Sequence, residues 1–311
     1  MNSSSRSSTF NFSEPALGLI AALGAFLTWG ALPLYFHLID RAVSPWEILA
    51  HRILWTAALL GIVVVLWRRT DRLWRVFRAP RLLGTLGLTA ALVATNWGTF
   101  IWAVVNDHVI EASLGYYINP LLNVALGFVF LGERLRRLQW IAVAIAATGV
   151  VFSVVAYGQV PWIGLILAGC FGFYGLIRKR LDVDSVTGLL VETLLLSPIA
   201  LAWLIRLYAT GGAAFGIAGP QTDALLIGAG VLTIVPFTLF AAGARRLRLG
   251  TIGIIQYLTP TLHFLTGVLV LHEPLTTADE VTFACIWLAL AIYTIDIVAS
   301  QWGTRRAARA A

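Results

Sequence analysis

The sequence predicts an all-α integral membrane protein in which ten transmembrane helices form two inverted five-helix repeats around a central cavity. Three observations indicate this fold: ten long apolar segments, basic residues confined to alternate connections, and a motif that recurs 140 residues later. Only 12% of the 311 residues are charged, whereas a soluble domain has about 25%. The mean hydropathy is +0.84, so most of the protein surface must face lipid rather than water.

The apolar segments have the length of membrane helices, because about 20 mostly apolar residues cross the hydrocarbon core as a helix. They are 15–39, 46–67, 82–105, 111–131, 138–157, 161–178, 187–208, 222–243, 250–271 and 277–299. Strands of a membrane barrel would be shorter, about 9–11 residues, and would alternate in polarity. The first segment also exceeds the apolar core of a signal peptide, about 7–15 residues, so we expect it to be retained. Residues 1–14 are expected to form a disordered cytoplasmic tail and residues 300–311 a second tail.

Basic residues orient these segments. If the N-terminus is cytoplasmic, all but three of the 22 basic residues fall on the cytoplasmic side or in the tails, the exceptions being Arg41, Arg52 and Arg206. Cytoplasmic connections of membrane proteins are enriched in Lys and Arg. We therefore expect a multi-pass protein of a bacterial inner membrane with both termini in the cytoplasm. The net charge of +7 then reflects orientation, and no nucleic-acid partner is expected.

An internal repeat divides the chain into halves, 15–157 and 158–299. At a separation of 140 residues, the first half matches the second in three places: Tyr117-x-x-Pro120 with Tyr257-x-x-Pro260, Gly127 with Gly267, and Leu131-x-Glu133 with Leu271-x-Glu273. Five is an odd number of spans, so the second half enters the membrane from the other side. Inverted repeats of this kind are typical of secondary transporters, whose substrate sites lie near the midplane between the repeats.

Two polar stripes lie at corresponding positions of the fourth and ninth spans. Residues at i, i+3, i+4 and i+7 share one face of a helix. The stripes are Tyr116, Asn119, Pro120 and Asn123 in the fourth span, and Gln256, Thr259, Pro260 and His263 in the ninth. Polar groups in a membrane face the bundle or a wet cavity, so they either line a substrate cavity or hydrogen-bond neighbouring helices.

Each proline in these stripes removes one backbone hydrogen bond and clashes with the carbonyl four residues earlier. Pro120 and Pro260 are therefore candidate helix hinges, with the carbonyls of Tyr116 and Gln256 freed near mid-depth; static kinks are the alternative. Further cavity candidates are Asn96 and the aromatic residues Trp29, Trp97, Tyr117, Tyr174 and Tyr257. Aromatic walls suit planar or cationic solutes, whereas ordinary packing explains each ring equally simply.

Glu192 is the main candidate for proton coupling, because it is a carboxyl clearly inside a span, about 7.5 Å beyond the inner boundary. Burial favours the neutral acid, and the alternative is an ion pair with a loop Arg or Lys. Its partners in the repeat are His51 and Arg52, in the outer half of the second span. For Arg52 we expect an outward partner: Asp40, Glu47 or Glu111.

Three further carboxylates are expected to be structural. Ser44-Pro45-x-Glu47 has the pattern of a capping box, in which Glu47 would bond the backbone of Ser44. Glu133 and Glu273 each end a helix, where the helix dipole disfavours a carboxylate. Each precedes another helix whose exposed amides it can cap, and Glu273 is also placed for an external gate.

Several of these stretches resemble the drug/metabolite transporter superfamily, EamA family, and within it the RarD (chloramphenicol-sensitive protein) subgroup. The resemblance spans residues 16 to 298, and His263 departs from it. The stretches are Glu47-Ile-Leu-Ala-His51-Arg52, Asn96-Trp97, Glu111-Ala-Ser-Leu-Gly-Tyr-Tyr-Ile-Asn119-Pro120-Leu, Leu131-Gly-Glu133-Arg, Tyr174-Gly175-Leu-Ile-Arg178-Lys179 and Gln256-Tyr257-x-x-Pro260-Thr. This resemblance implies ten helices around a central cavity and export of small metabolites or drug-like molecules without ATP.

The sequence thus predicts a secondary transporter that alternates access about the repeat axis, with protons as a candidate coupling ion. A facilitative, channel-like permease is one alternative. A membrane enzyme is another, but His272-Glu273 lacks the second His of a zinc-binding HExxH motif. We expect no cofactor, no metal, and no catalytic residues. The expected partners are a small-molecule substrate and the lipid bilayer, and the protein is expected to be a monomer or weak dimer.

The orientation is testable with reporter fusions. Fusions after Arg81, Arg137 and Arg248 should read as cytoplasmic, and fusions near Asp107 and Gly212 as external, because the basic connections stay inside. An external signal from a fusion after Arg309 would contradict the odd number of spans in each half.

Overall fold

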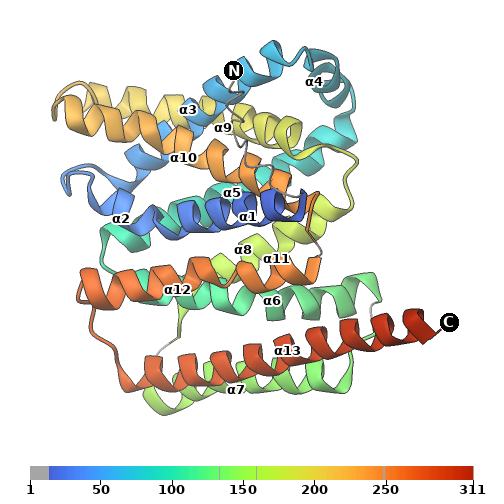
Figure 1. Cartoon of the computed structure of the whole chain (residues 1–311). Coiled ribbons are helices and arrows are strands. Elements are labelled where there is room, and N and C mark those ends of the chain that lie inside the picture. The colour runs from blue at the N-terminus through green and yellow to red at the C-terminus, as the bar shows by residue number, and fades with distance from the viewer. Residues whose placement is uncertain (1–13, 133, 159, 248, 311) are drawn as a thin grey trace, which may run out of the picture.

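The computed structural model describes residues 14–310 except 133, 159 and 248. Within this part of the chain, ten segments are long and apolar enough to cross a membrane, which confirms the predicted number. The helices run along a common direction (Figure 1). In chain order they are α1 (Glu14–Gly30), α2 (Leu32–His37), α3 (Pro45–Leu66), α4 (Thr70–Phe77), α5 (Pro80–Val105), α6 (Val109–Leu131), α7 (Arg137–Tyr157), α8 (Trp162–Lys179), α9 (Ser185–Ala209), α10 (Pro220–Ala244), α11 (Leu249–Ile255), α12 (Leu258–Leu265), η1 (Thr266–Val270) and α13 (Thr277–Ala310).

The two ends of the bundle differ in charge. One end carries α4 and the arginine-rich connections around residues 67–79, 132–136, 180–184 and 245–247, and we call it the basic end. The other end carries the connections 38–44, 106–108, 158–161, 210–219 and 271–276, and we call it the opposite end. In Figure 1 the basic end is at the right and the opposite end at the left.

Two predicted spans are broken rather than continuous. The first bends at Ala31, between α1 and α2, because Pro33 has no N–H to offer the Trp29 carbonyl. The ninth is α11, α12 and the π-helical turn η1, with a break at Gln256 and Tyr257 shortly before Pro260. By contrast, α6 continues as one helix through Pro120. The two prolines therefore occupy different local structures.

Two further differences lie at the basic end. The sequence did not predict α4, a short helix with Arg72 and Arg75 in it and Val76 buried. The last helix, α13, continues to Ala310 instead of ending at residue 299. The expected N-terminal tail falls almost entirely outside the described residues, as does Glu133.

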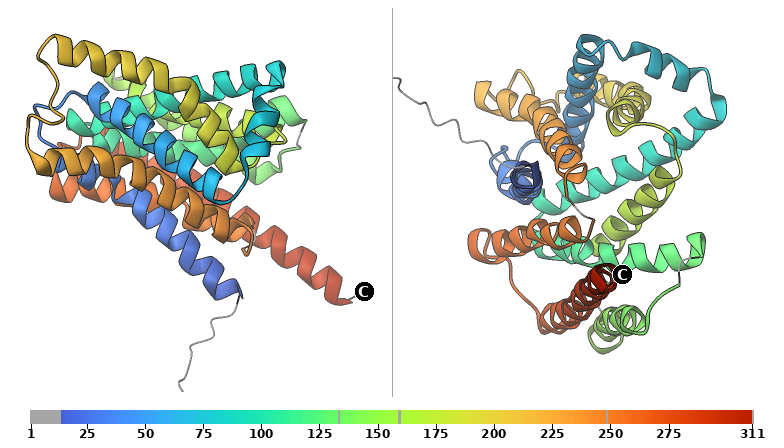
Figure 2. Two further views of the ribbon diagram at one scale, coloured as in Figure 1. Left: turned by 90° about the horizontal axis from the view of Figure 1, so that it is seen from above. Right: turned by 45° about the vertical axis from the view of Figure 1, so that its right-hand side comes forward.

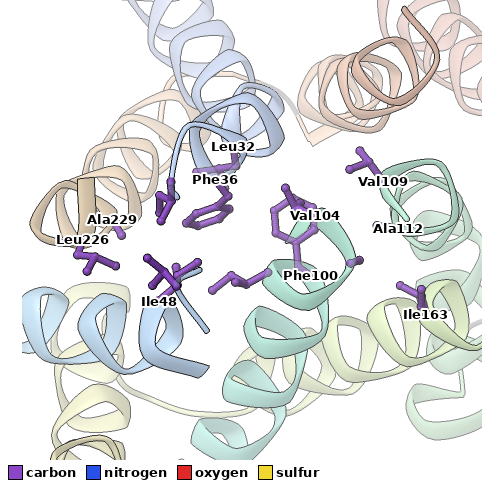
Figure 3. Packing of buried hydrophobic residues seen from close by; sticks show 14 of the residues in the cluster. Leu32, Phe36, Ile48, Phe100, Val104, Val109, Ala112, Ile163, Leu226 and Ala229 are labelled. Carbon is purple, nitrogen blue, oxygen red and sulfur yellow. The ribbon is translucent and has the colours of Figure 1, made fainter. Parts of the chain in front are cut away.

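Each half contributes its last span to one pair, α7 with α13, which lies at an edge of the bundle (Figures 1 and 2). The largest cluster of buried apolar residues in the described part of the chain lies nearer the opposite end, where α2, α3, α5, α6, α8 and α10 meet. Its buried residues include Phe36, Ile48, Phe100, Ile163 and Leu226 (Figure 3). Helices in lipid gain little from hydrophobic burial, so their association depends on close van der Waals packing.

The closest approach of this kind joins α6 to α8 at Gly115 and Gly164. A Cβ atom on Gly115 would lie 2.5 Å from the carbonyl oxygen of Gly164 and 2.9 Å from its Cα. Both atoms belong to the backbone, so an added methyl group would force the two helices apart.

Gly115→Ala should therefore lower the melting temperature of the detergent-solubilised protein, with a loss of about 1–3 kcal/mol typical of overpacking. Gly87→Ala on α5 is the matched control, because a Cβ there meets nothing within 4 Å. Equal melting temperatures for the two variants would show that the α6–α8 contact is not tight.

Candidate functional site

A buried arginine lies where the two halves of the bundle meet. Ser44 and Pro45 begin α3 at the opposite end, and Arg52 follows seven residues later, about 10 Å along the helix. Only 3% of Arg52 is exposed. Its Nε donates to Thr233 Oγ1 on α10 at 2.9 Å, and its guanidinium carbon lies 4.2 Å from the ring centroid of Trp97 on α5. The expected partners were wrong: among the described residues, no carboxylate lies within ion-pair distance of Arg52.

Asn96 extends this polar site toward α6 and α8. Its Nδ2 donates to the Leu167 carbonyl at 3.1 Å, and its Oδ1 accepts from the Tyr116 hydroxyl at 3.4 Å. The Tyr116 ring packs against Phe100, with centroids 5.7 Å apart. Asn96 and Tyr116 therefore join three spans next to Arg52 and Trp97.

His263 closes the site on the side of the ninth span. Its Nε2 lies 3.0 Å from the Trp29 carbonyl. This carbonyl has no helical donor, because the residue four positions later is Pro33, which has no N–H. Because a carbonyl only accepts, this nitrogen carries the proton, and the buried Nδ1 has no hydrogen-bond partner among the described residues. The ring stacks on Phe100 at 5.1 Å. The residue that departs from the family pattern thus satisfies a carbonyl exposed by a proline.

We name Arg52, Asn96, Trp97, Tyr116 and His263, with Thr233, the central polar cluster. It contains side chains of α3, α5, α6, α10 and α12, and so of both halves. Tyr116 belongs to the polar stripe predicted in the fourth span. Thr233 was not predicted, because hydroxyl groups are common in membrane helices and carry little positional information.

Glu192 lies in a separate cluster toward the basic end. It is fully buried and accepts from the Thr89 hydroxyl at 2.7 Å and from the Tyr174 hydroxyl at 3.2 Å. Arg178 Nε is 3.9 Å from its Oε1. We name Glu192, Thr89, Tyr174 and Arg178 the Glu192 cluster. The ionised carboxylate therefore has two hydroxyl donors and a nearby cation. This matches the alternative in which Glu192 forms an ion pair with an Arg or Lys.

The other predicted residues are distributed around these clusters. The Tyr117 hydroxyl shares a hydrogen bond with Thr261 at 2.7 Å. Asn119 and Tyr257 have buried polar atoms without a hydrogen-bond partner among the described residues. Gln256 is half-buried and Asn123 is exposed. His51 packs on the Phe215 ring at 4.5 Å, near the opposite end and away from Glu192.

Three carboxylates at the opposite end accept backbone amides from the other half of the chain. Glu47 accepts from Ala214 at 2.8 Å and from Phe215 at 3.0 Å. The other two cap helices: Glu111 accepts from Ile163 at the start of α8 at 2.8 Å, and Glu273 accepts from Val109 and Ile110 at the start of α6 at 2.7 and 2.8 Å. We call these the three carboxylate–amide contacts.

Two of these contacts correct the sequence analysis. The Glu47 carboxylate bonds the amides of Ala214 and Phe215 instead of the Ser44 amide, and the Ser44 hydroxyl accepts weakly from the Trp46 amide, at 3.4 Å. Glu273 caps α6 and not the helix that follows it. In both cases an amide distant in sequence lies closer than the local one.

Comparison with known proteins places this chain among bacterial membrane transporters. A family model described as the EamA-like transporter family matches residues 16–155. An uncharacterized transporter of Vibrio cholerae is 46% identical over 93% of this chain and 96% of its own length. Protein RarD of Escherichia coli is 43% identical over 93% of this chain and 97% of its own. Chloramphenicol-sensitive protein RarD of Pseudomonas aeruginosa is 38% identical over 88% and 92%.

A crystal structure with 20% identity has the same fold, at a TM-score of 0.54 over 89% of this chain and 96% of that one. With its ten candidate spans and these bacterial relatives, the chain is a multi-pass membrane protein.

Glu273 makes the opposite end sensitive to pH. Burial raises the pKa of Glu273, although the amides of Ile110 and Val109 and the nearby His108 lower it. The folded state therefore holds the proton more tightly than the unfolded state. This contribution to stability is present below the unfolded pKa, about 4.3, and declines as pH rises through the folded pKa.

The melting temperature of the native protein should accordingly fall, relative to that of Glu273→Gln, as pH rises from about 4 to 7. Glu280→Gln, an exposed position at the same end, should follow the native protein. A native protein that gains stability relative to Glu273→Gln over this range would show that the amide bonds outweigh burial.

Proposed function

Because the chain belongs to the EamA-like transporter family, we propose that it is a secondary transporter that moves small solutes across a bacterial inner membrane by alternating access. The central polar cluster, built by both halves, is the substrate site. Membership of a transporter family excludes the enzyme alternative. The name of the Pseudomonas aeruginosa relative supports drug-like molecules, besides metabolites, as candidate cargo. The basic end faces the cytoplasm, and export is the direction of net flux.

The observation that carries the proposal is the pattern of helix contacts. The spans correspond in order: α1 to α8, α3 to α9, α5 to α10, α6 to α12, and α7 to α13. If each helix is replaced by its counterpart, the contact α1–α10 becomes α8–α5, α3–α10 becomes α9–α5, and α1–α12 becomes α8–α6. All six contacts are made. The pairs α3–α9, α6–α12 and α7–α13 each exchange into themselves, whereas α3–α5 has no counterpart of similar extent between α9 and α10 in the described part of the chain. This pattern supports two related halves, and in transporters such halves move against each other around a central site.

Polar contacts between the halves lie at both ends of the bundle. The opposite end has the three carboxylate–amide contacts. At the basic end Arg246 pairs with Glu14 at 2.8 Å, and Arg72 pairs with Asp184 at 3.4 Å. Alternating access requires one set to separate while the other holds, so that the central polar cluster opens to one side at a time.

Coupling to protons takes place at Glu192. A charged carboxylate is costly inside a membrane protein unless it is paired, and here Thr89 of the first half and Arg178 supply the pairing. Protonation of Glu192 releases Arg178, whose Nη2 already lies 3.5 Å from the Asp184 carbonyl at the start of α9. The proton also removes the charge that strengthens the hydrogen bond from Thr89 of the first half, and so weakens one contact between the halves near the basic end.

Counterflow of radiolabelled solutes, including chloramphenicol, into proteoliposomes tests the transporter proposal. Solute exchange above that of empty vesicles supports it. A facilitative permease would equilibrate the solute without ever accumulating it. No exchange for any member of a broad panel of metabolites and drug-like molecules would contradict the proposal.

A gradient of one pH unit can drive accumulation of about tenfold if one proton is exchanged per solute. Glu192→Gln should abolish this accumulation, while counterflow exchange stays measurable. The amide mimics the protonated acid and cannot release a proton. Glu280→Gln, which removes an exposed carboxylate, should accumulate as the native protein does. If Glu192→Gln still accumulates solute with an unchanged pH profile, coupling lies elsewhere or is absent.

A further inference from the structure

Arg52 is a buried cation whose charge the described part of the chain does not neutralise. The buried or half-buried carboxylates near it are engaged elsewhere. Glu111 bonds Ile163, and Glu192 bonds Thr89 and Tyr174. Glu47 bonds the amides of Ala214 and Phe215 through Oε1, and its buried Oε2, which has no hydrogen-bond partner among the described residues, lies beyond ion-pair distance of Arg52. What remains for Arg52 is one neutral hydroxyl, Thr233, and the faces of Trp97 and Phe36.

Such an arrangement is costly in the absence of a ligand. A charge inside a membrane bundle lowers its free energy by pairing with an opposite charge or by contact with a water-filled cavity. Arginine cannot escape the cost by losing its proton. One hydroxyl and two aromatic faces offset only part of the desolvation of a guanidinium. The position therefore favours an anion that comes from outside the protein.

The geometry around Arg52 suits a planar or tetrahedral oxyanion. Thr233 and Trp97 hold the guanidinium from the Nε side and from one face. The terminal N–H groups form the two-pronged donor that matches a carboxylate or a phosphate. The Tyr116 hydroxyl, within electrostatic reach of Arg52, can donate to the same anion by giving up its long hydrogen bond, 3.4 Å, to Asn96 Oδ1.

A second observation points to a ligand in the same cluster. His263 is 2% exposed, and its Nδ1 has no hydrogen-bond partner among the described residues. Its ring stacks on Phe100 at 5.1 Å. Phe100 packs on Phe36 at 6.3 Å, and Phe36 in turn lies 5.8 Å from the Arg52 guanidinium carbon. The unsatisfied ring nitrogen and the unneutralised cation are thus connected through two packed rings, Phe100 and Phe36.

We propose that Arg52 binds the anionic group, a carboxylate or a phosphate, of the transported solute. The solute is then a small organic oxyanion, with its remaining groups against Trp97, Phe100 and His263. This inference rests on the proposed transport function and specifies the substrate class at its site.

Thermal stabilisation of the purified full-length protein in detergent tests the inference, because a ligand that binds the folded state raises the melting temperature. The probes are sodium acetate, sodium benzoate and inorganic phosphate, each compared with sodium chloride at equal ionic strength, and benzamide as the uncharged counterpart of benzoate. The variants are Arg52→Met and Arg52→Lys. Arg206→Met is the matched control, because Arg206 is exposed and also lies over a tryptophan, 5.4 Å from the Trp203 ring.

At least one oxyanion should raise the melting temperature of the native protein and of Arg206→Met by several degrees above the chloride value. A larger shift with acetate or benzoate than with phosphate would indicate a carboxylate, and the reverse order would indicate a phosphate. Arg52→Met should need at least tenfold more oxyanion for the same shift, and Arg52→Lys should retain part of it. An equal shift in Arg52→Met, or no oxyanion acting above chloride on the native protein, would overturn the inference.

Two controls keep the test decisive. If Arg52→Met does not fold, the native protein decides: stabilisation by benzoate and not by benzamide supports the inference, and equal stabilisation by both overturns it. Counterflow separates this inference from transport itself. If neutral solutes exchange in proteoliposomes and oxyanions do not, the transport function stands and the assignment of Arg52 is wrong. If no solute exchanges at all, the transport function is wrong as well.

Discussion

Glu47, Glu111 and Glu273 place negative charge against backbone amides that a membrane cannot hydrate. The first amides of a helix have no partner within that helix, and burying them without an acceptor costs about 1–3 kcal/mol each. Here the acceptor comes from the other half of the chain in all three cases, and for α6 and α8 it also opposes the positive end of the helix dipole. The two halves are joined at the opposite end by groups that neither half can satisfy alone. When this end opens, water must replace each partner, so the conformational change is tied to hydration from one side of the membrane.

The same requirement explains the centre of the bundle. Pro33 frees the Trp29 carbonyl in the first span, and His263 of the ninth span supplies the missing donor. Thr259, one turn earlier, donates to the Phe26 carbonyl at 2.9 Å. A proline in one half is thus compensated by a polar stripe in the other. The stripe of the ninth span therefore serves interhelical hydrogen bonding, one of the two readings that its sequence allowed, and also places an unsatisfied His263 nitrogen beside the candidate substrate site.

The sequence was sufficient for the features that depend on composition and length. Ten apolar runs of about 20 residues leave little freedom in the number of spans. The sequence was insufficient where a partner is distant in the chain. Arg52 bonds Thr233, 181 residues away, because a hydroxyl on a packed neighbour lies closer than any loop carboxylate. Glu273 caps α6 rather than the next helix, since folding of the halves against each other brings the start of α6 to it. Pro120 and Pro260 were both candidate hinges or kinks, and the sequence could not distinguish them: the ninth span breaks shortly before Pro260, whereas α6 continues through Pro120. The α6 helix continues without the hydrogen bond that Pro120 removes. In the ninth span the Gln256 carbonyl instead accepts from the amide three residues later, that of Thr259, at 3.3 Å.

The central claim is that the two ends of the bundle separate in turn while the central polar cluster stays between them. Electron–electron distance measurements test it most directly. Spin labels would be placed at exposed positions of the two halves: Arg41 and Leu275 at the opposite end, Arg134 and Arg245 at the basic end, in a protein with Cys170 and Cys285 replaced by alanine. Each pair should show a short and a long distance in reconstituted membranes, and the long-distance fraction at one end should fall as that at the other rises when pH or solute is changed. Fractions that rise together at both ends, or one unchanged distance at each, would contradict alternating access.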